Sequence, residues 1–263
     1  MQAVLERWLP DSKTKQILQT WWPLAASWLL MSVEMPALSA VIARLANPEI
    51  NLAAYGGIVF PLSLIFEAPI IMLLAASTAL NRDTQSYALL RKFMLVAGAV
   101  LTTIHMTVAF SPLYYIVVEK IIGVPHEIVE PARIGLMLMV PWSWSIAYRR
   151  FNQGIMIRYG YSQAVGAGTI VRLTAGGLVL VAGFLVKSVS GVAVGAAAQA
   201  LGVFSEAIYA SLRVRPVIRQ HLPRNWGGES LTWRAFANFY IPLALNSLLF
   251  LFWQPIEIGR AHV

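Results

Sequence analysis

Seven apolar stretches, each about as long as a membrane span, constrain this chain more than any other feature of its sequence. A helix needs about 20 mostly apolar residues to cross a bilayer. The stretches lie at roughly 17–43, 52–80, 88–110, 132–156, 163–186, 189–212 and 235–256. None of them alternates apolar and polar residues as barrel strands do, and only 12% of the chain is charged. We therefore predict an all-α polytopic membrane protein.

The first 16 residues are predicted to stay attached to the chain. They carry Glu6 and Asp11 beside basic residues, and the apolar run that follows is too long for a signal peptide and lacks a small-residue cleavage site. Trp8 and its apolar neighbours recur at helical spacing, which is typical of a short interfacial helix. The chain contains no cysteine, which excludes disulfides and thiolate metal sites.

Loop charges predict the orientation of the chain. The loops that would lie on one side of the membrane hold 14 Lys and Arg residues, and those on the other side hold four. Short basic loops stay in the cytoplasm, so the N-terminus is predicted to be cytoplasmic. The formal charge of +8 is mostly this orientation signal and predicts no nucleic-acid binding. We expect an integral protein of a prokaryotic inner (plasma) membrane.

The last apolar stretch repeats part of the first. Residues 240–256, YIPLALNSLLFLFWQPI, align with residues 21–37, WWPLAASWLLMSVEMPA, and the pairs Pro23/Pro242 and Pro36/Pro255 coincide. Leu and Ala matches arise easily between apolar helices, so the prolines carry the information. Both stretches would enter the membrane from the cytoplasm, as parallel repeats of a two-lobed transporter do. Chance placement of the prolines is the alternative.

Five short motifs run along nearly the whole chain: WPLA at 22–25, LAAYG at 52–56, SPLYYIVVEKIIGVP at 111–125, RRFNQGIMIRYGYSQAVG at 149–166, and PLAL at 242–245 with Pro255 after it. Their order and spacing resemble the first lobe of the MATE (multidrug and toxic compound extrusion) and flippase superfamily of transporters, also called the MOP flippase superfamily. The nearest likeness is to its progressive ankylosis (ANK) branch. The resemblance implies two six-helix lobes around a central cavity.

The resemblance and the charge pattern divide the chain into five predicted parts. These are a cytoplasmic interfacial segment (1–16), a six-helix transmembrane lobe (17–212), a basic cytoplasmic linker (213–234), the first helix of a truncated second lobe (235–256) and a tail (257–263). The tail, EIGRAHV, resembles translated sequencing-adapter read-through, although a genuine short C-terminus is the alternative. The rest of the second lobe is then expected to be the missing partner of this lobe.

Glu34 and Glu67 are predicted to lie within spans, where a charge at the bilayer centre costs about 2.5–3.5 kcal/mol. Each lies two residues before a proline, which kinks a helix and frees backbone carbonyls near the carboxylate. In the MATE family an acidic residue of the first helix is implicated in cation coupling, so the resemblance implies this role for Glu34. We predict both acids to be ion-coupling residues, for a proton or a sodium ion. A structural ion pair is the alternative.

Three arginines and one histidine are candidates for substrate binding. Arg149 and Arg150 lie near the end of the fourth span, and Arg172 lies about ten residues inside the fifth, too deep to reach the surface easily. A guanidinium fork suits phosphate and carboxylate groups, and the ANK branch is linked to export of pyrophosphate, nucleotide and citrate-like anions. His105 could bind substrate or join two helices. Glu206 is expected to be solvated at the cytoplasmic end of span six, and Arg149 and Arg150 could merely anchor theirs.

The sequence contains no His cluster with metal spacing, no phosphate-binding loop and no nucleophile motif, so we predict no enzyme, no cofactor and no metal site. The predicted function is secondary active transport: export of a small organic or phosphate-bearing anion by alternating access. A multidrug or cation extruder and a lipid-linked sugar flippase of the same superfamily are the alternatives. A non-transporting scaffold and an intramembrane enzyme are the least favoured.

Overall fold

The computed structural model describes residues 12–224 and 227–260, and within these ranges the chain is helical without strands. The helices are α2 (Ser12–Ser32), α3 (Glu34–Ile42), α4 (Pro48–Leu52), the π-helix η1 (Ala53–Val59), α5 (Phe60–Ile71), α6 (Leu73–Leu80), α7 (Thr84–Phe110), α8 (Leu113–Tyr115), the π-helix η2 (Ile116–Ile122), α9 (His126–Leu138), α10 (Val140–Arg158), α11 (Ser162–Val186), α12 (Gly191–His221) and α13 (Trp233–Arg260). Each predicted span corresponds to one of these helices or to two or more consecutive ones.

Five helical segments of the described chain are long and apolar enough to cross a membrane: Ile17–Ile42, Pro48–Leu80, Thr84–Phe110, Ser162–Val186 and Gly191–His221. The predicted fourth span, the broken pair α9 and α10, is not among them. Its second half carries Arg149, Arg150 and a set of buried polar side chains, which lower its apolar character. The described chain is nonetheless an all-α polytopic membrane protein, as the sequence predicts.

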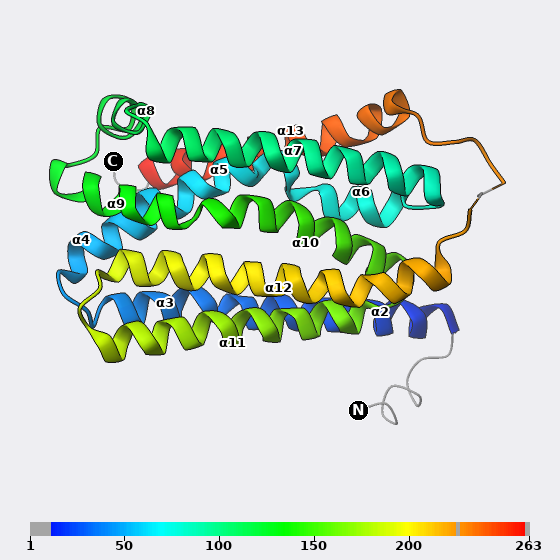
Figure 1. Ribbon diagram of the computed structural model, residues 1–263, viewed down its shortest axis with the longest axis horizontal. Helices are drawn as coiled ribbons and strands as arrows, with labels where there is room; N and C mark the ends of the chain where they lie inside the picture. The colour runs from blue at the N-terminus through cyan, green and yellow to red at the C-terminus, as the bar shows by residue number, and fades with distance from the viewer. Residues whose placement is uncertain (1–11, 225–226, 261–263) are drawn as a thin grey trace.

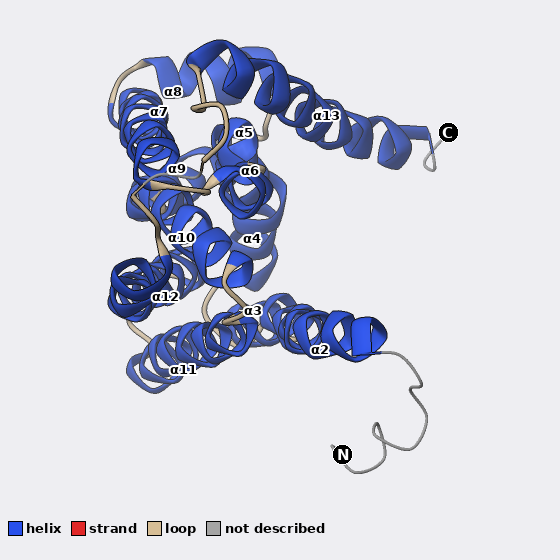
Figure 2. Ribbon diagram, turned by 90° about the vertical axis from the view of Figure 1, so that its right-hand side faces the viewer, coloured by secondary structure: helices blue, strands red, loops and turns tan. Residues whose placement is uncertain are grey.

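The long helices lie side by side along the length of the molecule, and the connections gather at its two ends (Figure 1). Viewed along the bundle, α10 lies inside it and is surrounded by other helices (Figure 2). It packs against α6, α7 and α12. In the same view α2 and α13 extend from one side of the bundle (Figure 2). Most of the side chains carried by α10 therefore lie in the interior of the bundle.

Three spans are broken at or near a proline. The first is interrupted at Val33, between α2 and α3 and just before Pro36. The second is broken at Met72, shortly after Pro69, and the fourth is broken at Met139. A proline cannot donate to the carbonyl four residues before it, so the helical ladder is interrupted there. Glu34 thus lies at a helix break, and Glu67 lies within α5, two residues before Pro69 and one turn before the break at Met72.

Small residues bring α11 and α12 close together. A Cβ atom at Gly176 would lie 3.1 Å from the carbonyl oxygen of Ala198, and one at Gly202 would lie 3.0 Å from that of Arg172. Such backbone approach is typical of membrane helix pairs with Gly and Ala at the contact. It places Arg172 of α11 directly against α12, which carries the polar residues of the site.

The first part of the predicted linker, 213–234, is helical in the structure. Helix α12 continues to His221, and the non-helical connection begins only at Leu222. At about 1.5 Å per residue, a helix of 31 residues exceeds a hydrocarbon core of about 30 Å, so its basic end extends beyond that core. The connection then returns to α7, where the backbone N–H of Thr84 donates to the carbonyl of Pro223 at 3.1 Å.

Helix α13 packs its first half against the lobe. The hydroxyl of Tyr240 donates to the carbonyl oxygen of Pro69 at 2.7 Å. Phe93 of α7 contacts Phe236 and Tyr240, with ring centroids 4.8 Å apart in both pairs. The opposite face of this half leaves Ile241, Leu245 and Leu249 exposed.

The predicted division into lobes and linker is not tested by these contacts and stays a prediction. The first 11 residues of the N-terminal segment and the last three residues of the tail lie outside the described ranges.

Candidate functional site

Arg172 and Glu34 form a two-point ion pair between α11 and the start of α3. Nε of Arg172 donates to Oε1 of Glu34 at 2.9 Å, and Nη2 donates to Oε2 at 2.6 Å. The two side chains are 4% and 12% exposed. A buried guanidinium keeps its proton, so it needs a carboxylate partner or a polar cavity, and in this structure it has the carboxylate.

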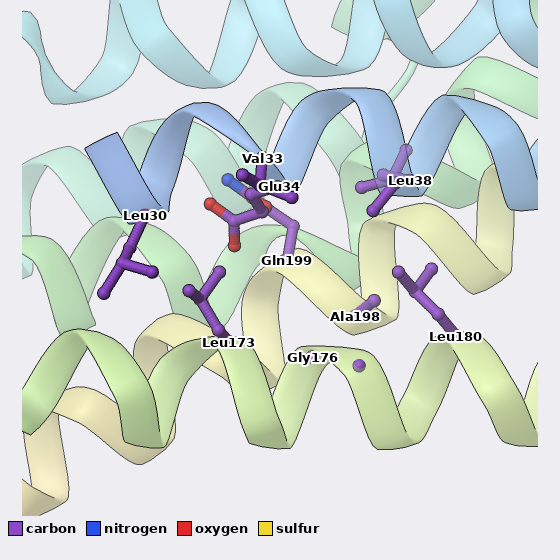
Figure 3. Close-up of a pocket in the computed structure, with 11 residues that line it drawn as sticks. Leu30, Val33, Glu34, Leu38, Leu173, Gly176, Leu180, Ala198 and Gln199 are labelled. Carbon is purple, nitrogen blue, oxygen red and sulfur yellow. The ribbon is translucent and has the colours of Figure 1, made fainter. Parts of the chain in front are cut away.

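Gln199 of α12 adjoins this pair, and Figure 3 shows its side chain facing Glu34. With the amide oriented to satisfy both neighbours, its nitrogen lies 3.1 Å from Oε1 of Glu34 and its oxygen 3.1 Å from Nη2 of Arg172. A cavity of about 240 Å³ opens beside these groups, and its other lining residues are apolar, among them Leu30, Val33 and Leu173. Glu34 and Gln199 thus line an otherwise apolar pocket at the break between α2 and α3.

Glu206 lies in the interior of the lobe, which corrects the expectation that it is solvated. Its side chain is 1% exposed. Nη1 of Arg149 donates to its Oε2 at 2.7 Å, and Nε2 of Gln153 donates to its Oε1 at 2.8 Å. The helix that carries it is longer than predicted, so a position near the end of the predicted span is well inside the packed part of α12.

The two ion pairs are neighbours. Nη1 of Arg172 lies 4.0 Å from Oε2 of Glu206, the same oxygen that accepts from Arg149. Glu34, Arg172, Glu206 and Arg149 therefore follow one another with alternating charge across α3, α11, α12 and α10. We call these four side chains the charge chain.

Arg150 and Glu67 lie near the charge chain without belonging to it. Among the described residues, no carboxylate oxygen is within 4.0 Å of the Arg150 guanidinium. Nε of Arg150, Nε of Arg149 and Oε2 of Glu67 are buried without a hydrogen-bond partner. Arg150, Arg149 and Arg172 are within electrostatic reach of the Glu67 carboxylate. The structure thus brings together five of the six predicted site residues.

His105 is the sixth, and it has two partners in the packing between helices. Its Nδ1 lies 2.8 Å from the hydroxyl of Ser143, and its Nε2 lies 3.0 Å from the carbonyl oxygen of Leu136. The ring is fully buried and stacks on Phe66. This is the helix-joining alternative that the sequence left open, and substrate binding by His105 stays a prediction.

Three polar residues of the site were not among the predicted site residues: Gln153, Gln199 and Glu206. A signal for two of them exists in the sequence, because Gly195, Gln199, Gly202 and Glu206 recur at spacings of four, three and four. Positions with this spacing share one helix face. A face of glycines with two polar residues is typical of a buried helix contact, so it predicts that both polar side chains are enclosed.

Tyr55 on the π-helix η1 also faces the pair. Its side chain is 3% exposed, its hydroxyl has no hydrogen-bond partner, and it is within electrostatic reach of Glu34 and Arg172. Single π-helical turns are frequent at functional sites.

No group of three or more His, Cys, Asp or Glu residues within the described ranges is arranged to hold a metal ion.

The family model of the progressive ankylosis protein (ANKH) matches residues 9–247 of the chain. The fold is similar to a multidrug resistance MATE family transporter of the MOP superfamily, solved in an outward-facing conformation, with a TM-score of 0.69 and 16% identity over 93% of this chain and 54% of that one.

A second similar structure is a MOP superfamily transporter from Pyrococcus furiosus, for which a reverse polarity of the binding pocket is described as suggesting a different function. Its TM-score is 0.66 at 13% identity, over 89% of this chain and 52% of that one. At these identities the likeness concerns the fold alone. The chain spans about half the length of either transporter.

Proposed function

The chain belongs to the progressive ankylosis protein (ANKH) family, and on this premise we propose that it forms the first lobe of a secondary active transporter that exports a small organic or phosphate-bearing anion. The fold is that of transporters of the MOP superfamily, which work as two lobes. The second lobe would close the substrate cavity against this one, and alternating access would follow from movement of the two lobes relative to each other.

One observation supports an anionic substrate. Guanidinium N–H donors in the interior of the lobe have no hydrogen-bond acceptor. Arg150 has no carboxylate within 4.0 Å among the described residues, and the Nε atoms of Arg149 and Arg150 are buried without an acceptor. A buried donor without an acceptor costs about 1–3 kcal/mol. Phosphate and carboxylate oxygens match the planar fork of arginine, so such an anion would supply the missing acceptors.

Glu34 is the proposed ion-coupling residue. It occupies the first position of α3, at the break in the first span, and both its oxygens accept from Arg172. Binding of a proton or a sodium ion there would weaken the ion pair and the hold of α3 on α11. The conformation of the first span would then depend on the ion gradient.

A transport assay tests the substrate class. The complete transporter is reconstituted in proteoliposomes, and efflux of citrate, pyrophosphate or nucleotide is compared with efflux of a cationic dye. Arg150→Gln should reduce anion efflux by about tenfold or more, since a charged hydrogen bond is worth about 1.5–3 kcal/mol. Arg219→Gln, at the exposed end of α12, serves as the matched control and should leave efflux unchanged.

A cation extruder is the second candidate, and Glu67 favours it. Its side chain is 4% exposed and its Oε2 has no hydrogen-bond partner, so a cationic drug could provide one. Under this alternative the dye is exported, Glu67→Gln abolishes its export, and Arg150→Gln has no effect. That outcome would replace the anion transporter proposed above.

A further inference from the structure

The charge chain contains one carboxylate oxygen that two arginines can share. Oε2 of Glu206 accepts from Arg149 at 2.7 Å and lies 4.0 Å from Nη1 of Arg172. Arg172 is meanwhile held by Glu34 at 2.6 and 2.9 Å. A movement of about 1 Å would bring Arg172 to hydrogen-bond distance of Glu206. Arg172 is therefore placed between two carboxylates and bonded to one of them.

We propose that Glu206 is a positioning residue that links ion binding to anion binding by exchange of arginine partners. When a proton neutralises Glu34, Arg172 turns to Glu206, and Arg149 is released from Glu206 to bind the anion. The inference rests on the proposed function, since it takes the anion and the coupling role of Glu34 from there. The inference adds the residues that connect Glu34 to the anion, and it says whether proton binding strengthens or weakens anion binding.

The sign follows from the charge of the interior. The buried cluster holds three carboxylates and three guanidinium groups: Glu34, Glu67, Glu206, Arg149, Arg150 and Arg172. It is neutral when all six are ionised. An anion entering a neutral interior of low dielectric is unfavourable unless a positive charge enters with it. A proton at Glu34 provides that charge, so proton and anion should bind together and each should raise the affinity of the other.

The charged and polar groups around Glu34 come from several elements. Arg172 comes from α11, Gln199 and Glu206 from α12, and Tyr55 from η1. Glu67 on α5 and the arginines of α10 lie further along the same cluster. Protonation of Glu34 removes the acceptor of Arg172, and Glu206 is the carboxylate nearest to the released guanidinium. The direction of the exchange is set by this arrangement.

Transport of the two ions in the same direction is the consequence. Each exported anion should leave together with a proton. The anion should not be exchanged for an incoming proton. Linkage is reciprocal. If one proton binds with each anion, the affinity for the anion falls by up to about tenfold per pH unit wherever Glu34 is ionised in the protein without anion.

The test measures citrate binding to the purified complete transporter between pH 6 and 9. The ionisation of citrate itself is the same for every variant and cancels in the comparison. In the parent, affinity should fall as the pH rises, with uptake of about one proton per citrate. Glu206→Gln frees Arg149 permanently, so binding should keep only the pH dependence that the ionisation of citrate itself causes and, at pH 9, should be at least about tenfold tighter than in the parent. Glu206→Asp should restore the pH dependence.

Two further variants complete the design. Glu34→Gln should leave the same pH dependence of binding, and combining it with Glu206→Gln should give less than the sum of the two effects, because both act on the same path. Glu229→Gln removes an exposed carboxylate outside the bundle and should behave as the parent does. If Glu206→Gln does not fold, the inference is still tested by Glu34→Gln and by the number of protons that the parent takes up with each citrate.

Several outcomes would overturn the inference. Glu206→Gln could weaken binding equally at every pH, as loss of a purely structural ion pair would. Citrate binding could release protons, or the double variant could show the sum of two effects. In each of these cases anions still bind and only the exchange of partners is wrong. Failure of the parent to bind or export any anion would instead remove the proposed function.

Discussion

The guanidinium of Arg172 meets the carboxylate of Glu34 at two points, although 138 residues separate them in the chain. The contact joins the break in the first span to the middle of the fifth, and both side chains are largely buried. Removing one partner of such a pair leaves the other charge without compensation, at a cost of about 3–5 kcal/mol. Changes at either residue should therefore affect stability and transport together.

Arg172→Ala should abolish anion export by the complete transporter, because Glu34 and Glu206 would face each other with no cation between them. Arg172→Lys should preserve part of the activity, since lysine keeps the charge and loses the two-point fork. Efflux from cells or proteoliposomes with matched expression measures both. Full transport by Arg172→Ala would contradict the role assigned to this arginine.

Glu34→Gln should weaken the dependence of transport on the proton or sodium gradient without removing the protein from the membrane. The amide keeps the size of the side chain and cannot change its charge, so the ion loses its binding group. Efflux measured with and without an imposed gradient, for each ion in turn, gives the answer. An unchanged response to both gradients would assign coupling to another residue, with Glu67 as the next to test.

Two glycines provide a matched pair for the packing of the lobe. A Cβ atom at Gly154 would lie 2.7 Å from the carbonyl oxygen of Leu74, whereas one at Gly177 meets nothing within 4 Å. Gly154→Ala should therefore destabilise the contact of α10 with α6 by about 1–3 kcal/mol. Gly177→Ala should be neutral or stabilising by up to about 1 kcal/mol. Thermal unfolding in detergent compares the two, and equal stability would show that α10 and α6 are further apart.

Single cysteines should report the topology. The starts of α4 and α9 and the connection between α11 and α12 lie at one end of the bundle, and the start of α7 and the end of α12 lie at the other (Figure 1). Glu49, His126 and Ser188 are exposed residues of the first group of segments, and Gln85 and Gln220 are exposed residues of the second. An impermeant thiol reagent applied from outside should label the first three only, since the basic loops that predict a cytoplasmic side are at the other end. Labelling of Glu49→Cys and Gln85→Cys from the same side would exclude this arrangement.

Much of the fold follows from apolar length, because a bilayer requires spans of nearly fixed size. The breaks also follow, since Pro36 and Pro69 remove backbone donors at known positions. The extension of α12 to His221 could not be predicted from span length, because a helix can continue into water where side chains allow it. Here Gln220 and the arginines before it are the polar side chains that allow α12 to continue into water.

The site was predictable residue by residue and only in part as a set of contacts. A buried arginine requires a partner, so Arg172 could be expected to meet Glu34 or Glu67. Which of the two it meets depends on the rotation of α11 and α3 about their axes, and apolar periodicity fixes this poorly when a helix is apolar on most sides. Glu206 was misplaced because its depth was counted from the end of a predicted span that is too short.

The balance of three carboxylates against three guanidinium groups also has an electrical consequence. A charge carried across the whole membrane changes the energy of a moving lobe by about 2.3 kcal/mol for every 100 mV. A lobe whose buried groups sum to zero does no such work when it changes its orientation without cargo. The buried groups of this lobe should therefore add no voltage dependence to the return of the empty transporter.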